Sequence, residues 1–322
     1  MKKALVISGG GVKGAWALGW IDYNISKNPN FLNEFDLFIG TSIGALISVS
    51  LSIGKFKEMK ELFLKLTNDD VYTRCPFKIK EKHGIGVYDI KINLFNVFYN
   101  LYIKNLATVG DTTKVIDLIK KIYTAEDHLN LIKSNKELYV TTTNINTGEL
   151  LYVSPKNLDY ETFINFVFSS TCAAPIMSII EINGNQYVDG GILENVPIQK
   201  AVENTNITDI VVLNLNSDIK VSTWINSPIK LITKYFDVFL KRGNEDDILI
   251  GMLKATQLNK TIKIYTPSQY LTDFPFVFDN YDINEFFKIG ISDAERTFYF
   301  GSNEKIITFD NGKVFISKRN KF

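Results

Sequence analysis

Histidine and cysteine are scarce in this sequence. Its 322 residues include two histidines and two cysteines, Cys75 and Cys172. The cysteines form no Cys-x-x-Cys motif and have no histidine at the spacing of a zinc site. The sequence therefore predicts neither a disulfide framework nor a metal site, and it is compatible with a reducing compartment.

A strong excess of charge and a membrane-spanning run are also missing. The 36 basic and 35 acidic residues leave a net charge of +1, which gives no electrostatic reason to expect nucleic acid as a partner. The longest apolar stretch, residues 43–53, is too short to cross a bilayer. Met1-Lys2-Lys3 imitates the start of a signal peptide, but glycines from Gly9 onward interrupt the apolar run. We expect a cytoplasmic protein or one peripheral to a membrane, with secretion as an effector left open.

A serine motif stands out because the chain has so few histidines. Ser42 is the centre of Gly40-Thr41-Ser42-Ile43-Gly44, a Gly-x-Ser-x-Gly elbow between a strand-like run at 35–39 and a helix-like run at 43–51. Such an elbow exposes a nucleophilic serine, whose hydroxyl needs a base. His83 and His128 fit none of the familiar chain orders of serine triads. If Ser42 is catalytic, its base should be a carboxylate.

The same motif also has a purely structural interpretation. Ser42 would cap the following helix, and the two glycines would let that helix pack closely on the strand. Three fixed residues of this kind recur by chance in roughly one chain in ten of this size. The motif alone therefore leaves both interpretations open.

A glycine loop follows the first apolar run, residues 4–7, and opens a helical segment at 12–27. In Ser8-Gly9-Gly10-Gly11-Val12-Lys13-Gly14, consecutive backbone N–H groups can line one concave surface, which suits an oxyanion. Lys13 either adds positive potential and locks the loop or is a solvated helix residue. The spacing of Gly9, Gly11 and Gly14 also matches a dinucleotide fingerprint. That match is disfavoured, because the second strand runs into the serine elbow and not into an acidic residue.

The carboxylate that we predict as the base is Asp189. It follows a short apolar strand in Tyr187-Val188-Asp189-Gly190-Gly191, where the glycines let another backbone approach closely. A plain turn aspartate is the alternative, and in water its pKa of about 3.9 makes it too weak a base. Burial beside an acyl chain would raise that pKa. In the resulting hypothesis Asp189 accepts the Ser42 proton, and the N–H groups of Gly10 and Gly11 hold the oxyanion. This chemistry needs no metal and no cofactor.

The remaining pattern predicts one α/β domain over residues 1–322 with a mainly parallel sheet. Hydrophobic residues make up 45% of the chain, which is enough for a large core. We expect the core at about 1–54 and 136–215, a helical insertion or cap at about 55–135, and C-terminal helices and strands at about 216–322. We expect three hairpins: one pairs 137–143 with 150–153, one lies near 181–188, and one pairs 306–309 with 314–316. We also expect strands at 210–215 and 261–265 and helices at 115–123, 229–240 and 248–258.

The segment 91–103 within the insertion is dense in aromatic residues that asparagines separate. Packing of a helix onto the core is the interpretation that this composition favours. The alternative is a mobile cap or an interfacial surface that meets lipid.

Three motifs, taken in their order along the chain, resemble the patatin-like phospholipase family. They are Gly9-Gly10-Gly11-Val12-Lys13-Gly14, Gly40-Thr41-Ser42-Ile43-Gly44 and Asp189-Gly190-Gly191. Ser170-Thr171-Cys172-Ala173-Ala174-Pro175 and Asn195-Val196-Pro197 are similar to the family as well, so that the resemblance covers about residues 4–215. It implies a three-layer α/β/α fold and a Ser-Asp dyad formed by Ser42 and Asp189. It also implies an oxyanion hole at Gly9, Gly10 and Gly11, with Lys13 standing where the family has arginine or lysine.

The resemblance implies a lipid acyl hydrolase of the phospholipase A type that takes substrate from a lipid or membrane surface without a cofactor. Lys13, Gly14, Gly40, Gly44, Gly190 and Gly191 would support the site. Two alternatives stay open: acyl transfer from the same acyl-enzyme to an alcohol or lysolipid, and a non-catalytic effector that binds lipid or a partner. The lipid headgroup and any protein partner are not specified by these motifs.

Overall fold

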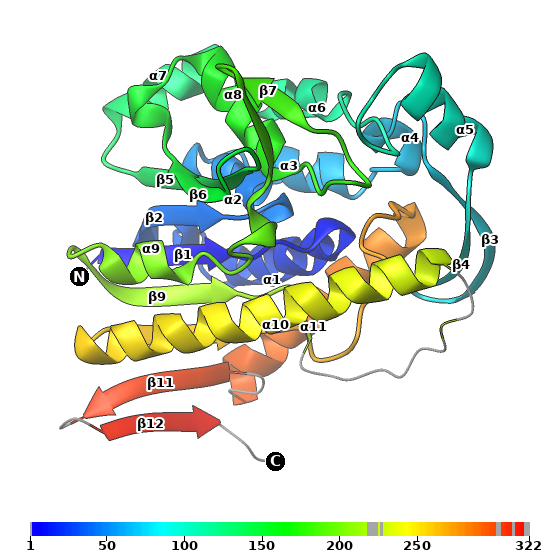
Figure 1. Cartoon of the computed structure of the whole chain (residues 1–322). Helices are drawn as coiled ribbons and strands as arrows, with labels where there is room; N and C mark the ends of the chain where they lie inside the picture. Colours follow the sequence, from blue (N-terminus) through cyan, green and yellow to red (C-terminus); the bar gives the residue numbers. More distant parts are fainter. Residues whose placement is uncertain (1, 218–224, 226–227, 301–303, 311–312, 319–322) are drawn as a thin grey trace.

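The N-terminal β-α-β unit places the glycine loop and the serine elbow side by side. The computed structural model describes residues 2–217, 225, 228–300, 304–310 and 313–318 (Figure 1). Strand β1 (Lys2–Ile7) leads through the glycine loop and the 3-10 turn η1 (Gly11–Lys13) into helix α1 (Gly14–Lys27). Strand β2 (Phe35–Gly40) pairs in parallel with β1 and enters helix α2 (Ile43–Ser52) at the elbow. Both loops therefore leave the carboxyl end of the sheet, as the sequence predicts.

The main sheet is parallel at its centre and antiparallel towards both edges. Its other strands are β5 (Glu137–Asn144), β6 (Glu149–Val153), β7 (Ile180–Ile182), β8 (Asn185–Asp189), β9 (Ile207–Leu213), β10 (Thr261–Tyr265), β11 (Glu304–Asp310) and β12 (Lys313–Lys318). Within the described residues the strand order is β12-β11-β10-β9-β1-β2-β5-β8-β7, and β6 pairs with β5. The pairs from β10 through β9, β1 and β2 to β5 are parallel. The remaining pairs are antiparallel.

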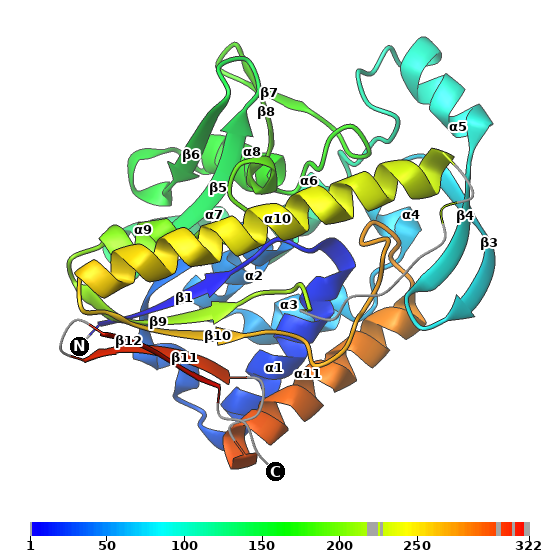
Figure 2. The ribbon, with the colours of Figure 1, turned by 60° about the horizontal axis from the view of Figure 1, so that its bottom comes forward.

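Helices cover both faces of this sheet and give the predicted three-layer α/β/α arrangement (Figure 2). The covering helices that follow the insertion are α8 (Tyr160–Ser170), α9 (Ile198–Glu203), α10 (Pro228–Gln257) and α11 (Asn280–Phe300). Successive side chains of β1 point to opposite faces. Leu5 and Ile7 pack into the core that contains α1, α2 and α11 residues, whereas Ala4 and Val6 pack into the core that contains α9 and α10 residues.

The segment expected as an insertion, at about 55–135, contains a hairpin that the sequence analysis missed. We expected helices and loops, but β3 (Phe77–Gly84) and β4 (Val87–Ile92) form a separate two-stranded antiparallel sheet. Only β4 carries a clear alternation, with Tyr88 and Ile90 buried, while β3 is exposed almost throughout. An exposed strand lacks the period-two signal that identifies strands in a sequence. The helices of the insertion are α3 (Phe56–Phe63), α4 (Asn68–Val71), α5 (Leu94–Phe98), the π-helix η3 (Tyr99–Ile103), α6 (Val115–Ile122) and α7 (Ala125–Lys133).

The two helices expected at 229–240 and 248–258 are wrong as separate elements, because α10 is continuous through both. Polar residues between the two apolar stretches include Asn244 and Asp247, which are buried and bonded to Asn195. The predicted pairing of the C-terminal hairpin is confirmed for β11 and β12, while its turn at 311–312 lies outside the described residues. Across the part of the chain that the structure describes, no helix combines the length and apolar character needed to cross a membrane.

Candidate active site

Ser42 occupies a strained turn between β2 and α2. Its φ of 57° and ψ of −127° lie in a region that residues with side chains rarely adopt. The flanking glycines permit this tight turn, because a Cβ on Gly40 would lie 2.1 Å from the carbonyl oxygen of Gly44. Ser42 stands at the N-cap position of α2, but its hydroxyl makes no capping hydrogen bond. The helix-cap interpretation is therefore wrong.

Asp189 lies at the end of β8 and lines the same cleft as Ser42. Its Oδ1 accepts a hydrogen bond from the N–H of Gly191 at 2.8 Å, and the Ser42 hydroxyl lies close enough to influence the pKa of the carboxylate. Asp189 is 6% exposed, and this burial raises its pKa from 3.8 to about 7, although the Ser42 hydroxyl and the Gly191 N–H act in the opposite direction. The carboxylate is thus a stronger base than an aspartate in water. Gly190 packs against Thr141 without room for a side chain.

The segment 170–175 positions both of these residues. Ser170 ends α8, and its Oγ accepts the backbone N–H of Ser42 at 3.0 Å. Two residues further on, the carbonyl oxygen of Cys172 accepts the backbone N–H of Asp189, also at 3.0 Å. One short segment thus holds the serine elbow and the aspartate turn in register with each other.

The glycine loop lies against Ser42 and offers two backbone donors. A Cβ on Gly9 would lie 3.2 Å from the Cβ of Ser42, so the close approach requires glycine. The N–H of Gly9 donates to the carbonyl oxygen of Asn195 at 3.1 Å. Among the described residues, none accepts a hydrogen bond from the N–H of Gly10 or Gly11. Gly10 and Gly11 therefore have donors available for an oxyanion, whereas Gly9 provides space.

Lys13 is buried, so its interpretation as a solvated helix residue is wrong. Its Nζ donates to Oδ1 of Asn216 at 2.8 Å, in the segment that follows β9. Burial lowers the pKa of Lys13, and the carboxylates of Asp237 and Asp273 oppose that effect. The side chain ties the turn after the glycine loop to the neighbouring strand end. Gly14, the next residue, packs directly against Ile43 of α2.

One cleft brings the predicted catalytic residues together, and neither histidine lines it. Its walls include Gly10, Gly11, Ser42, Asp189, Gly191 and Asn195. His128 is buried in α7, with its Nδ1 2.9 Å from the hydroxyl oxygen of Tyr123. His83 is exposed on β3, with its Nε2 3.3 Å from a carboxylate oxygen of Asp89. Asp189 therefore shares this cleft with Ser42, whereas His83 and His128 do not line it.

A buried polar network beside the glycine loop contains residues that the sequence analysis missed. Oδ2 of Asp247 in α10 accepts the backbone N–H groups of Asn195 and Val196, each at 2.9 Å. The side chain of Asn195 donates to Asn244 Oδ1 at 2.7 Å and to the carbonyl oxygen of Gly9 at 3.4 Å. Burial raises the pKa of Asp247 to about 6. Asn244 and Asp247 lie three residues apart and therefore share one face of the helix. This spacing in the sequence does not show that both bind Asn195.

An apolar pocket opens beside Ser42. It holds about 800 Å³ of empty space, including its mouth. Its walls come mainly from α2 and from the helices of the insertion. Ser42 and Phe276 each line both the pocket and the cleft, so the two spaces adjoin beside Ser42. Further apolar wall residues are Leu46, Met59, Phe63, Leu118, Ile119 and Ile122.

Comparison with known proteins agrees with this combination of α/β/α fold, serine elbow and apolar pocket. The family model described as patatin-like phospholipase matches residues 5–202. The chain belongs to the patatin-like phospholipase family, and the resemblance carried by the three motifs is confirmed.

Two viral proteins and one bacterial structure are similar to this chain. "Uncharacterized protein L620" of Acanthamoeba polyphaga mimivirus is 26% identical over 283 residues, which cover 76% of each chain. "Probable lipid hydrolase 463L" of Invertebrate iridescent virus 6 is 27% identical over 238 residues, which cover 72% of this chain and 71% of that protein. VipD from Legionella pneumophila aligns with a TM-score of 0.47 and 15% identity over 96% of this chain and 68% of VipD.

Proposed function

We propose that this protein is a lipid acyl hydrolase of the phospholipase A type, with Ser42 as nucleophile and Asp189 as its base. Membership of the patatin-like phospholipase family and the relative described as a probable lipid hydrolase support this activity. The observation that carries the proposal is that Ser42 and the buried carboxylate of Asp189 line one cleft, which meets the apolar pocket beside Ser42. Cleavage of a lipid ester requires a nucleophile with a base near it and a site for an acyl chain.

Acylation begins when Ser42 Oγ attacks the ester carbonyl carbon and its proton passes to Asp189. The carbonyl oxygen becomes an oxyanion that accepts hydrogen bonds from the N–H groups of Gly10 and Gly11. Each preorganised donor of this kind contributes on the order of a hundredfold in rate. As the intermediate collapses, the bond from carbon to the alkoxy oxygen breaks, and Asp189 returns the proton to the leaving alcohol. An acyl-enzyme on Ser42 remains.

Deacylation repeats these steps with water as the nucleophile. Asp189 accepts a proton from the water whose oxygen attacks the acyl carbon, and the same two N–H groups hold the second oxyanion. Collapse breaks the bond between the acyl carbon and Ser42 Oγ, and the proton moves from Asp189 to that oxygen. The products are a fatty acid and the free serine. An alcohol or lysolipid in place of water would give acyl transfer by the same route.

The pKa of Asp189 matches this proton exchange. At a pKa of about 7, a large fraction of the carboxylate is ionised at neutral pH, and its affinity for the serine proton exceeds that of an ordinary aspartate. An acyl chain that fills the adjoining pocket excludes water from Asp189, which strengthens the base further.

Product analysis on defined phospholipid vesicles tests the proposed function. Native protein should release free fatty acid and lysophospholipid, and Ser42→Ala should release neither. Ser48→Ala is the matched control, because Ser48 is buried on the same helix and, among the described residues, has no hydrogen-bond partner for its hydroxyl. If an added lysolipid becomes acylated and no free fatty acid is released, the activity is acyl transfer and not hydrolysis. Equal product release by Ser42→Ala and native protein would overturn the assignment of Ser42.

A further inference from the structure

Five large apolar side chains on α5 and η3 face outward. Each is between 55% and 75% exposed. Packing of this segment onto the core, which its composition favoured, is therefore wrong for these residues. We call them the outer aromatic face: Leu94, Phe95, Phe98, Tyr102 and Ile103. Figures 1 and 2 both place α5 at the periphery of the molecule, above the β3–β4 hairpin.

The polar side of this segment, and not its apolar side, is attached to the protein. Asn96 Nδ2 donates to the carbonyl oxygen of Cys75 at 2.9 Å, and the fully buried Asn100 donates to that of Val109 at 2.8 Å. The guanidinium of Arg74 lies 3.9 Å from the ring centre of Tyr99. The asparagines therefore hold the helix while the apolar face stays in solvent. This arrangement is the reverse of an ordinary surface helix.

Positive charge accompanies the outer aromatic face. Residues 91–110 contain no aspartate or glutamate. On the adjoining hairpin, the exposed Lys78 and Lys91 stand directly opposite each other, and the exposed Lys80 follows two residues along β3. Like charges in opposing positions of a strand pair are unfavourable without a counter-charge. A surface that combines exposed aromatics with such lysines complements the interface of an anionic bilayer.

The segments before and after the outer aromatic face are each hydrogen-bonded to residues at or next to the candidate active site. Tyr72, two residues before Arg74, donates its hydroxyl to the carbonyl oxygen of Phe276 at 3.1 Å, and Phe276 lines the pocket and the cleft. The N–H of Val109 donates to the carbonyl oxygen of Pro175 at 3.0 Å, next to the cleft residue Ala174. The outer aromatic face is thus held by segments that border the cleft.

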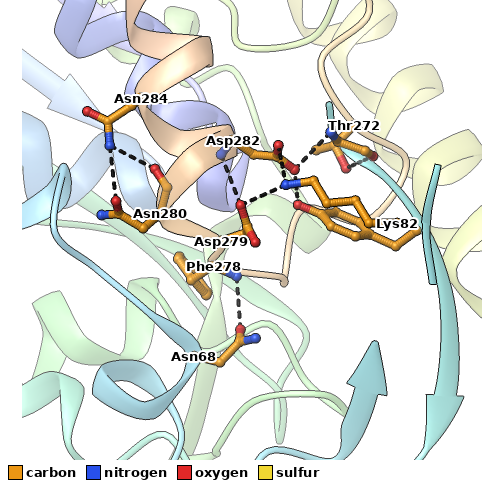
Figure 3. A network of polar contacts seen from close by, with 10 residues as sticks. Asn68, Lys82, Thr272, Phe278, Asp279, Asn280, Asp282 and Asn284 are labelled. Atoms are coloured by element: carbon orange, nitrogen blue, oxygen red, sulfur yellow. Dashed lines mark hydrogen bonds and ion pairs between the residues drawn. The ribbon is translucent and has the colours of Figure 1, made fainter. Parts of the chain in front are cut away.

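The hairpin is fixed by the fully buried Asp282 at the start of α11 (Figure 3). Asp282 accepts the N–H of Gly86 at 2.9 Å and forms an ion pair with Lys82 at 2.8 Å. The hydroxyl of Tyr88 also donates to Asp282. Thr272 completes the attachment by donating to the carbonyl oxygen of Gly86 at 2.7 Å. These contacts give the lysines on the hairpin a defined place relative to the body of the protein.

We propose that the outer aromatic face and the lysines of the hairpin dock the protein onto bilayers that contain anionic lipid. The aromatic and aliphatic side chains enter the interfacial region, and the lysines contact the headgroups. The choice of a bilayer rests on the proposed function, because a membrane is the source of the lipid ester. A second copy is less suited as the occupant, since a two-fold interface would bring the same lysine-rich patch of both copies together.

Vesicle flotation of Ser42→Ala protein tests the docking without consuming lipid. The vesicles contain phosphatidylcholine alone or mixed with phosphatidylglycerol, and we expect tighter binding to the mixture. Adding Phe95→Ser and Phe98→Ser should weaken binding to both kinds of vesicle at least about tenfold. Adding Lys78→Gln and Lys91→Gln should weaken binding about twenty-five-fold on the mixture and leave the neutral vesicles unaffected, since each lysine contributes about fivefold.

The matched control replaces two equally exposed leucines on other elements, Leu129 of α7 and Leu253 of α10, by serine. It should bind as the Ser42→Ala protein does. Equal binding by the Phe95/Phe98 variant and this control would overturn the proposal. So would a loss of self-association in the Phe95/Phe98 variant without any change in vesicle binding, which would assign the face to a second copy.

Activity measurements separate this proposal from the proposed function. With Ser42 intact, the Phe95/Phe98 variant should lose hydrolysis of anionic vesicles and keep hydrolysis of a short-chain ester in solution. If vesicle binding depends on Phe95 and Phe98 while neither substrate is cleaved, the docking stands and the hydrolase proposal fails. If both substrates are cleaved equally by the variant and native protein, the hydrolase proposal stands and the docking fails. Circular dichroism and thermal unfolding verify that each variant folds.

Discussion

The segment 55–135, which we expected to be an insertion, has two apolar surfaces, and only one of them is buried. The inner surface includes Met59, Phe63 and Ile119, which line the pocket beside Ser42. The outer surface is the outer aromatic face on α5 and η3, which lies in solvent. Both come from short helices with many large hydrophobic residues. Apolar content therefore does not decide which of the two is buried.

The partners of the polar side chains account for the difference. In α6, the charged residues Asp117 and Lys121 are exposed, so that Ile119 turns toward the pocket. In α5 and η3, Asn96 and Asn100 find backbone carbonyl partners inside the protein, so the aromatic residues turn outward. Because a buried amide must be hydrogen-bonded, two asparagines are enough to orient a short helix. The two surfaces then suit different tasks, holding an acyl chain and meeting a bilayer.

The largest expected effect is on the chemistry that both surfaces serve. Asp189→Asn removes the proposed base, and kcat/KM should fall at least about a thousandfold both for a short-chain ester in solution and for vesicles. Steady-state kinetics on the two substrates, with circular dichroism of the variant, checks this. A loss confined to vesicles would mean that Asp189 acts in docking and not in proton transfer.

The pH dependence should be the same on both substrates, because Asp189 must be ionised to act as the base. With a pKa of about 7, the log of kcat/KM should rise with pH and level off above neutrality, and at pH 5 the rate constant should lie about a hundredfold below its plateau. Profiles from pH 5 to pH 9 measure this. Activity that is level down to pH 5 would contradict a base with a raised pKa.

The free energy of unfolding should fall as pH rises, whereas kcat/KM should rise. The folded protein holds the Asp189 proton up to a pKa of about 7, whereas the unfolded chain releases it near 3.8. The stability contributed by protonated Asp189 is therefore complete below 3.8 and lost as pH rises through 7. Relative to Asp189→Asn, native protein should lose up to about 4 kcal/mol of unfolding free energy between pH 4 and pH 8. Urea unfolding of both proteins across this range provides the measurement.

The inner surface should control acyl-chain length. Leu118→Trp places an indole in the pocket, and kcat/KM for a long-chain ester should fall about tenfold because methylene groups lose their site. Activity on a short-chain ester should stay within about twofold. Leu118→Met, which conserves volume, is the control. An equal loss on both esters would show that the pocket does not hold the chain.

The smallest effect concerns a single charge beside the outer aromatic face. Lys80→Gln should reduce hydrolysis of vesicles containing phosphatidylglycerol about fivefold at subsaturating lipid. Neutral vesicles and the soluble ester should be cleaved as by native protein. The reduction should disappear at high salt, because screening removes the contribution of the lysine. A reduction that persists at high salt would rule out headgroup attraction as its cause.

The core of the site could be predicted because its signals are local. Glycines mark the loop before α1, the elbow around Ser42 and the turn after Asp189, and each follows an apolar strand. Parallel strand order then brings the loop and the elbow to one edge of the sheet. The placement of Asp189 beside Ser42 additionally depends on the segment 170–175, whose similarity to the family pointed to it without revealing its contacts.

The remaining features depend on contacts that no local pattern encodes. Asp247 interrupts the apolar pattern of α10 because it bonds to the distant Asn195, so two helices were expected where one exists. The exposed strand β3 lacks alternation, so the hairpin was missed. The orientation of α5 depends on which carbonyl groups accept the hydrogen bonds of Asn96 and Asn100. Each case requires knowledge of the tertiary partner.

Labelling with a fluorophosphonate tests most directly whether Ser42 is a nucleophile activated by Asp189. After reaction of native protein in the presence of vesicles, mass spectrometry of its peptides should locate the phosphonyl group on Ser42 alone. Ser42→Ala should remain unlabelled, Asp189→Asn should label far more slowly, and Ser48→Ala should label as native protein does. Absence of labelling in folded native protein, or a label on another residue that survives in Ser42→Ala, would contradict the Ser42-Asp189 dyad.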